Sequence, residues 1–312
     1  MALNQRNEKA VRWVRGGIVI VLLLFAAAIS FQAFADPDGA VSSFLKWTHR
    51  EIAFPPMYGG FHIAFLVLTA LLVGLVLAFY RRISRARLDD IVFCSGIVLF
   101  LLELYKQLYY HTVLGNGYYN FGILPLQLCS YVLYLYLLLP LLPIGRVKHT
   151  LYLFAAFYQT AGGCVVLFCP LFYRQLSLSV HTMLWHVVMT TVGLLILLVR
   201  GCGTYYRREI LPAALVFLSV YGFGMTMNVL LAPLAEHSAA PLNLFYLSPL
   251  EETHNLIIAD VRNALGWFPA VVAYAVLITG VCVNLIWLVA RAVRVTEERG
   301  RRRRETKNGE KD

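Results

Sequence analysis

Apolar residues fill eight stretches of the chain, each close to the roughly 20 residues that cross the hydrocarbon core of a bilayer. The stretches cover residues 16–35, 59–80, 90–110, 123–143, 148–169, 178–200, 209–232 and 265–290. The loops between them are too short to fold separately, so the spans should pack as one domain. The pattern predicts an all-α, polytopic transmembrane bundle of about eight helices.

Two basic segments flank this bundle of residues 16–290. Residues 1–15 precede it, and residues 291–312 form a tail that we expect to be disordered. The first span also resembles a secretory signal, because Ala33-Phe-Ala35 follows a basic start and an apolar run. That run is long for a signal, so we expect the first helix to be retained. Cleavage would leave seven spans with the same downstream orientation.

Composition excludes an ordinary soluble domain, since 59% of the residues are hydrophobic and 14% are charged. The net charge of +10 does not indicate a nucleic-acid partner, because the basic residues gather in alternate loops. They are Arg6, Lys9, Arg12, Arg15, Arg81, Arg82, Arg85, Arg87, Arg146, Lys148, Arg200, Arg207, Arg208 and the tail from Arg299 to Arg304.

This alternation predicts that both termini of a multi-pass cell-membrane protein are cytoplasmic. The loop of residues 233–264, expected on the outer side, carries Glu236, Glu251, Glu252 and Asp260 instead. The basic tail either stays solvated or contacts anionic head groups.

Cysteine spacing indicates neither a disulfide framework nor a metal knuckle. The six cysteines stand at 94, 129, 164, 169, 202 and 282, without a Cys-x-x-Cys pair. The sequence also lacks a Gly-rich phosphate loop and a His-Glu-x-x-His motif. We therefore expect no metal and no cofactor.

Cys129 is the residue that points to chemistry. It follows Pro125 by one helical turn inside an apolar segment of membrane length. Proline is favoured at the first position of a helix, so Pro125 should begin a span with Cys129 in its first turns. A helix N-terminus stabilises the thiolate, which is the nucleophilic form. The alternative is that Cys129 only packs as a small apolar side chain.

Ionisable residues within the spans are the other candidates, because burying them in a bilayer is costly. Glu103 and Lys106 share a face of the third span, where they form either a structural ion pair or part of a site. His181 and His186 lie five residues apart in the sixth span and face different directions, which argues against a shared metal. His186 lies deeper and is the better candidate base, unless it is a core histidine bonded to a carbonyl.

The predicted topology places several of these side chains at one depth. Glu103, Cys129 and His186 should lie roughly 6–12 Å from the outer ends of their spans, at 1.5 Å per residue. Asn228 and His62 fall in the same layer. If the helices are neighbours, the polar groups share a pocket that opens toward the extracytoplasmic side.

Four motifs resemble the YwaF family of bacterial integral membrane proteins. They are the segment Leu124-Pro-Leu-Gln-Leu-Cys129-Ser, the helix with Glu103 and Lys106, the histidine of the sixth span, and the segment Leu242-Asn-Leu-Phe-Tyr-Leu-Ser-Pro249. That family is similar to the transmembrane protein 164 acyltransferase family, which remodels ether phospholipids with an essential cysteine. The resemblance covers about residues 60–290.

The resemblance implies that Cys129 is the acyl-accepting nucleophile and His186 its base. Asn243 and Tyr246 would lie in a loop that closes over the pocket. The family usually has histidine two residues before the cysteine, whereas this chain has Gln127, whose amide can donate a hydrogen bond to an oxyanion.

These observations predict ping-pong acyl transfer on a membrane lipid, with a phospholipid or lysophospholipid as the partner. A first rival is a transporter of protons or small solutes, in which Glu103, Lys106 and His186 line a path. A transport path should be lined by polar residues in both leaflets, but the inner halves of the spans hold few polar residues. A second rival is a non-catalytic, lipid-binding membrane protein.

Overall fold

The computed structural model describes residues 2–115, 118–200, 206–231, 233, 242–251 and 256–309. The longer α-helices are α1 (Ala2–Ala35), α3 (Gly60–Phe79), α4 (Arg85–Tyr109), α8 (Leu176–Arg200), α9 (Tyr206–Leu230) and α12 (Trp267–Gly309). The shorter ones are α2 (Ala40–Trp47), α5 (Tyr131–Leu138), α6 (Arg146–Phe154), α7 (Thr160–Phe168) and α11 (Leu256–Leu265). No strand occurs within these ranges, so the predicted all-α fold is confirmed.

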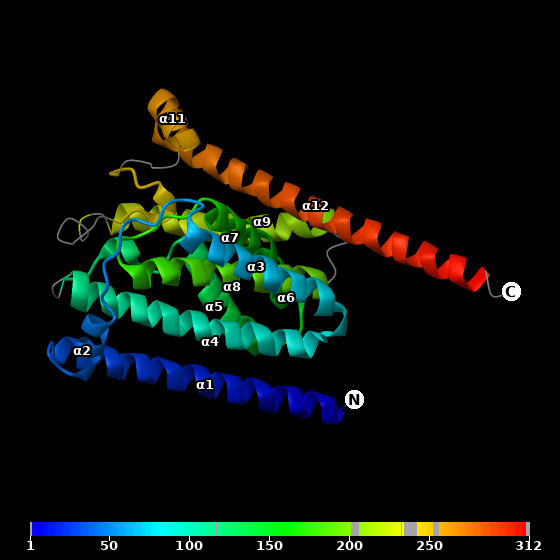
Figure 1. Ribbon diagram of the computed structural model, residues 1–312, viewed down its shortest axis with the longest axis horizontal. Coiled ribbons are helices and arrows are strands. Elements are labelled where there is room, and N and C mark those ends of the chain that lie inside the picture. The colour runs from blue at the N-terminus through cyan, green and yellow to red at the C-terminus, as the bar shows by residue number, and fades with distance from the viewer. Residues whose placement is uncertain are drawn as a thin grey trace.

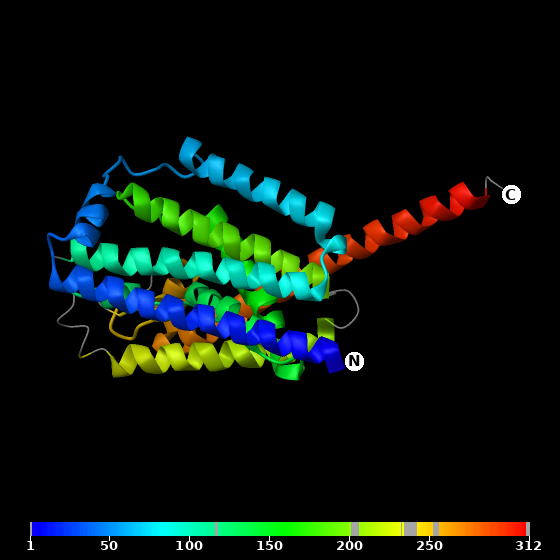
Figure 2. The same cartoon turned by 90° about the horizontal axis from the view of Figure 1, so that it is seen from below.

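The long helices lie side by side in a bundle, and both ends of the described chain point the same way (Figures 1 and 2). We call this the terminal end; η1 (Tyr80–Arg82) and the first turns of α4 and α6 lie there. The opposite end holds α2 and residues 242–251. The shared position of the two ends of the described chain agrees with the expectation that both termini lie on one side of a membrane.

Six described helical stretches are long and apolar enough to cross a membrane. They are Glu8–Ala35, Gly60–Arg82, Arg146–Phe168, Leu176–Arg200, Ile210–Leu230 and Trp267–Val293. α4, with 25 residues, is about 37 Å long and lies along α1 and α8. The expected span of residues 123–143 is different, because its apolar helical part covers only Leu128–Leu141.

α8 is the central helix of the bundle. In its most apolar 18-residue stretch, 72% of the residues are buried inside the protein, whereas none are buried in the corresponding stretch of α3. A helix that is apolar on all sides is stable at the surface only where lipid replaces water, so α3 should face the bilayer.

α7 and α8 pack closely through two glycines. A Cβ atom at Gly163 of α7 would overlap Thr190 Oγ1 of α8, and a Cβ at Gly193 of α8 would overlap Thr160 Oγ1 of α7. Each glycine thus admits a threonine from the other helix, as is common where membrane helices approach closely.

The last helices are separated by Gly266, whose φ of +94° ends α11. α12 then continues through the basic tail to Gly309 instead of ending near residue 290 as expected. Arginine and lysine are good helix formers and no proline or glycine interrupts the helix between residues 281 and 299, so the span continues past the bundle. Its C-terminal part projects beyond the terminal end (Figure 1).

Candidate active site

Cys129 lies at a break in the helical path of the chain. After η2 (Tyr110–Leu114), the described residues 118–127 contain a single helical turn, η3 (Phe121–Ile123). Regular helix resumes at η4 (Leu128–Ser130) and continues through α5 and η5 (Leu139–Leu141). The thiol therefore stands in the first turn of a half-length helix.

Pro125 does not begin this helix, which corrects the sequence-based expectation. It lies in a tight turn in which Leu126 N–H bonds Leu124 C=O at 2.7 Å. The extended backbone of Gln127, with ψ of 155°, then separates that turn from η4. Proline fixes only its own φ, so it suits a turn as well as a helix start.

Two side chains from neighbouring helices bond the backbone at the break. Gln159 Nε2 donates to Leu128 C=O at 2.9 Å, and Trp185 Nε1 donates to Cys129 C=O at 3.1 Å. Trp185 is nine residues into α8, or about 14 Å from its start. Non-helical backbone at such depth persists only where the protein satisfies its polar groups. The break is therefore a built feature of the bundle.

The Cys129 side chain is half-buried among charged and phenolic groups. Lys106 and Glu103 of α4 lie within its electrostatic range. The phenols of Tyr173, Tyr246 and Tyr274 interact with it in the same way, although they come from three distant parts of the chain. The Lys106 cation and the helix N-terminus favour the thiolate, whereas burial and the Glu103 carboxylate oppose it.

Glu103 and Lys106 form the ion pair that their spacing predicts, with Nζ and Oε1 2.9 Å apart. Gln107 Nε2 donates to the same Oε1 at 2.7 Å and to Ile123 C=O at 2.9 Å, while Tyr119 donates to Gln107 Oε1. This network ties α4 to the non-helical segment. The second carboxylate oxygen, Glu103 Oε2, is buried and has no hydrogen-bond partner.

The two histidines of α8 face different neighbours. His181 stacks on Trp185 with ring centroids 5.5 Å apart and lies within electrostatic range of Lys106. His186 is about 100° further round the helix than Trp185, and its backbone lies against Gly163 of α7. The described contacts thus connect His181 to the surroundings of Cys129. They include no direct contact between either histidine and Cys129.

Each histidine nevertheless keeps one nitrogen able to accept a proton. His186 Nδ1 lies 2.7 Å from Thr182 C=O, and a carbonyl can only accept, so Nδ1 carries the hydrogen of the neutral ring. The Nε2 atoms of His181 and His186 are both buried without a partner. Nε2 is therefore the unprotonated nitrogen of the neutral His186 ring.

Gln127 and Asn228 clamp the loop of residues 242–248 onto the bundle. Gln127 donates from Nε2 to Asn243 C=O at 2.9 Å and accepts at Oε1 from Phe245 N–H at 2.7 Å. Asn228 of α9 bonds Leu244 in both directions, at 3.0 and 2.8 Å. Gln127 thus uses its carbonyl oxygen and one N–H for the loop, and one N–H is left for any oxyanion.

The clamped loop holds two consecutive residues in the left-handed region, Phe245 and Tyr246, each with φ of 58°. Such a conformation is rare for bulky side chains and costs about 1–3 kcal/mol per residue. The Phe245 ring is fully buried in the space left by Gly224, where a Cβ atom would overlap it. With Phe245 fixed there, the neighbouring Tyr246 lies within range of Cys129.

The remaining sequence-predicted residues have local partners. Asn243 Oδ1 accepts from Ser248 N–H at 2.9 Å, inside the loop. His62 is fully buried away from Cys129, between Leu167 C=O at 2.7 Å and Tyr58 N–H at 2.9 Å. Glu236, Glu252 and Cys202 lie outside the described residues. Within the described part of the chain, no group of three or more His, Cys, Asp or Glu side chains could hold a metal ion.

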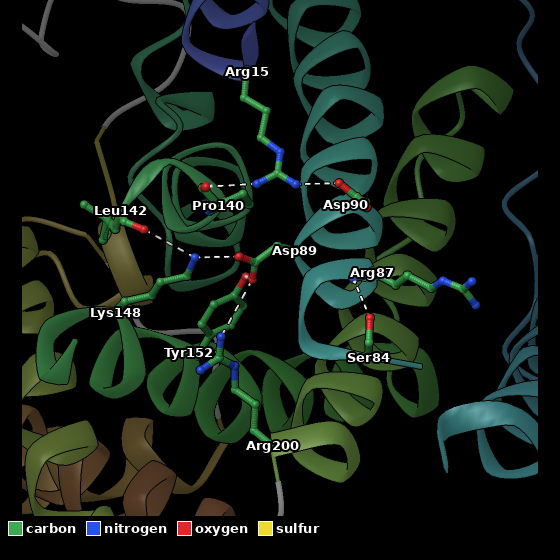
Figure 3. Close-up of polar contacts among 10 residues, drawn as sticks. All are labelled: Arg15, Ser84, Arg87, Asp89, Asp90, Pro140, Leu142, Lys148, Tyr152 and Arg200. Atoms are coloured by element: carbon green, nitrogen blue, oxygen red, sulfur yellow. Dashed lines mark hydrogen bonds and ion pairs between the residues drawn. The ribbon is translucent and has the colours of Figure 1, made fainter. Parts of the chain in front are cut away.

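A second polar cluster, at the terminal end, escaped the sequence analysis (Figure 3). Asp89 of α4 accepts from Lys148 Nζ at 2.5 Å and from the Tyr152 hydroxyl at 2.6 Å. Its neighbour Asp90 pairs with Arg15 of α1, which also donates to Pro140 C=O. We call these residues, together with Arg200, the ion-pair network.

Compared with known proteins, the chain matches no protein-family model, no curated protein and no solved structure. The geometry of the site is therefore the basis for assigning a function.

Proposed function

We propose that this membrane protein transfers acyl groups between lipids, with Cys129 as the nucleophile. The observation that carries the proposal is the placement of Cys129 in the first turn of a half-length helix, inside the bundle and in range of Lys106. A free cysteine used only for packing needs neither a broken helix nor a nearby cation. Membership of the YwaF family, and similarity to the transmembrane protein 164 acyltransferases, belong to this proposal.

The first half-reaction would form a thioester. A histidine of α8 takes the thiol proton, and the thiolate attacks the ester carbonyl of a phospholipid. The ester C–O bond breaks, the histidine returns the proton to the leaving lysolipid oxygen, and the acyl group stays on Cys129. In the second half, the hydroxyl of an acceptor lysolipid, or water, loses its proton to the same histidine and attacks the thioester. The C–S bond breaks, the acyl group leaves on the acceptor oxygen, and the histidine returns the proton to the Cys129 thiolate.

We assign the base to His181, because it shares Lys106 with Cys129 and stacks on the tryptophan that bonds the Cys129 backbone. The sequence predicts His186 for this role, and the two histidines can be tested separately. Tyr246 and the free N–H of Gln127 are the candidate donors to the oxyanion.

The test is a covalent intermediate. Purified protein incubated with acyl-labelled phospholipid should accumulate label on Cys129 that hydroxylamine releases. Cys129→Ala should abolish the label, whereas Cys164→Ala, which removes another half-buried thiol, should not. His181→Ala should slow labelling by roughly 10²- to 10⁴-fold, the usual effect of removing a general base, and His186→Ala should do less. Equal labelling of Cys129→Ala and the unmodified protein would overturn the proposal.

One observation favours transport as a second candidate. Half-length helices that begin inside the membrane bind ions and solutes in secondary transporters, with the helix N-terminus toward an anion. The buried ion-pair network at the terminal end argues against an open path in this conformation. The test is uptake of a small organic anion into proteoliposomes. If the Cys129→Ala variant takes up the anion as well as the unmodified protein does, transport would be favoured over acyl transfer.

A further inference from the structure

Arg200 is the cation that the ion-pair network leaves incompletely paired. Both Asp89 oxygens already accept short hydrogen bonds, from Lys148 at 2.5 Å and from Tyr152 at 2.6 Å. Arg200 Nη2 stands 3.7 Å from Asp89 Oδ1, beyond hydrogen-bond distance. Its Nε atom is buried and has no hydrogen-bond partner. A guanidinium has five N–H donors, so the contacts with Asp89 and Tyr152 leave part of its donor capacity unused.

The geometry fixes the Arg200 guanidinium at the end of its span. Its central carbon lies 3.7 Å from the centroid of the Tyr152 ring, so the two planar groups are in contact. Tyr152 is fully buried, and only 13% of the Arg200 side chain is exposed. Arg200 is the last residue of α8, the depth at which lipid head groups meet the hydrocarbon core.

The ion-pair network at the terminal end contains more positively than negatively charged side chains. Two buried cations, Arg15 and Lys148, and the partly buried Arg200 share the two carboxylates Asp89 and Asp90. Arg85 also acts electrostatically on Arg200 without a carboxylate of its own among the described contacts. Further exposed arginines border the network on η1 and on the first turns of α4 and α6, namely Arg81, Arg82, Arg87 and Arg146.

We infer that Arg200, together with Arg85, binds the phosphate of an anionic phospholipid head group at the terminal end of the bundle. Arginine presents a planar pair of donors that matches two phosphate oxygens, and basic pockets between membrane helices are suited to acidic head groups. Burial at the end of a span favours a lipid phosphate over a soluble one, because the acyl chains bring the phosphate to this depth. This inference does not depend on the chemistry of Cys129.

Lipid-dependent thermal unfolding of the purified full chain in detergent provides the test. Added phosphatidylglycerol should raise the unfolding midpoint in a saturable way, whereas equal amounts of phosphatidylcholine or inorganic phosphate should not. Arg200→Gln should weaken the apparent affinity for phosphatidylglycerol roughly 10- to 100-fold, since hydrogen bonds to a charged group are lost. Arg87→Gln is the matched control, because the Arg87 side chain points away from the network (Figure 3). It should change the affinity less than about threefold.

Three results would overturn the inference. Equal stabilisation by the anionic and the zwitterionic lipid would show that the site does not require a negatively charged head group. Equal stabilisation by inorganic phosphate would show that the site does not require a lipid. Equal weakening by Arg87→Gln and Arg200→Gln would show diffuse attraction instead of a site. If Arg200→Gln does not fold, the unmodified protein can be cross-linked with a photoactivatable phosphatidylglycerol. The inference requires cross-links at the end of α8 or the start of α4, and cross-links only elsewhere would contradict it.

Discussion

The indole of Trp185 bonds the backbone carbonyl of Cys129, not its thiol, at 3.1 Å. α8 therefore positions the start of the half-length helix and leaves the sulfur free. The carbonyl belongs to the 3₁₀ turn Leu128–Ser130, and the break before that turn places the thiol among groups from α4, the 242–248 loop and α12.

Trp185→Phe should destabilise the protein by about 1–3 kcal/mol, because it leaves the Cys129 carbonyl buried without a donor. Thermal unfolding in detergent measures this loss. The same variant should change the alkylation rate of Cys129 by iodoacetamide, since the first turn of the helix loses its anchor. Trp287→Phe, on the exposed part of α12, is the control and should cost under about 0.5 kcal/mol. Equal losses for the two variants would show that the hydrogen bond contributes nothing.

Glu103 and Lys106 should depend on each other. Glu103→Gln leaves the Lys106 ammonium buried without a counter-ion, and breaking a buried pair costs about 3–5 kcal/mol. Exchanging both residues, Glu103→Gln with Lys106→Met, should cost clearly less than the sum of the single changes. Strictly additive losses in a thermal-unfolding cycle would contradict the coupling that the 2.9 Å distance indicates.

Asn228→Asp should release the 242–248 loop. The change removes the Nδ2 donor to Leu244 C=O and places a carboxylate at a fully buried position. Hydrogen exchange of the peptide that contains Leu244 to Leu247 should accelerate at least about tenfold. Asn284→Asp is the matched control, because that exposed amide bonds only Gly280 in its own helix among the described contacts. Unchanged protection of the loop would mean that Phe245 packing alone holds it.

Gly193→Ala should destabilise the bundle by about 1–3 kcal/mol, since its Cβ would overlap Thr160 Oγ1. Adding Thr160→Ala should recover some of the loss by removing that atom. Gly74→Ala on α3 provides the comparison, because no atom lies within 4 Å of the added Cβ. A loss at Gly74 as large as that at Gly193 would assign the effect to glycine itself and not to helix packing.

The topology can be checked with reporter fusions. Reporters placed after residues 85, 146 and 205 should all read cytoplasmic, because basic residues cluster at these loops. The structure places Arg15, Asp89, Lys148 and Arg200 in one network, so these loops must share a side. A periplasmic reading at two of the three positions would reverse the orientation assigned to the Cys129 site.

The helical fold and one ion pair could be predicted from the sequence. Long apolar runs specify membrane helices by length alone, and residues three apart on a helix must be neighbours, which gave Glu103 and Lys106. The break before Cys129 could not be found in the same way. Residues 121–128 are as apolar as a span, and the bonds that permit the break come from Gln159 and Trp185, which are remote in sequence.

Two further features depend on tertiary contacts. Asp89 stands beside Asp90 and two arginines, so in the sequence it looks like a residue of a solvated loop; only packing shows that it meets α6 and α8. The periodicity of α8 shows that His181 and His186 face different sides, but it does not tell which side faces Cys129. The partner of Trp185 supplies that information.

The reciprocal glycine and threonine contacts of α7 and α8 also restrict where a lipid could enter the bundle. An acyl chain that reaches Cys129 sideways from the bilayer must push a pair of helices apart. The seam between α7 and α8 cannot widen unless both threonines leave the space beside Gly163 and Gly193. α9 and α12 meet through the nearly parallel rings of Tyr221 and Tyr274, 5.7 Å apart, and the Tyr221 hydroxyl donates a hydrogen bond to Val271 C=O of α12 at 2.9 Å. An acyl chain that entered through this second seam would have to displace that hydrogen bond before it reached Tyr274, a neighbour of Cys129.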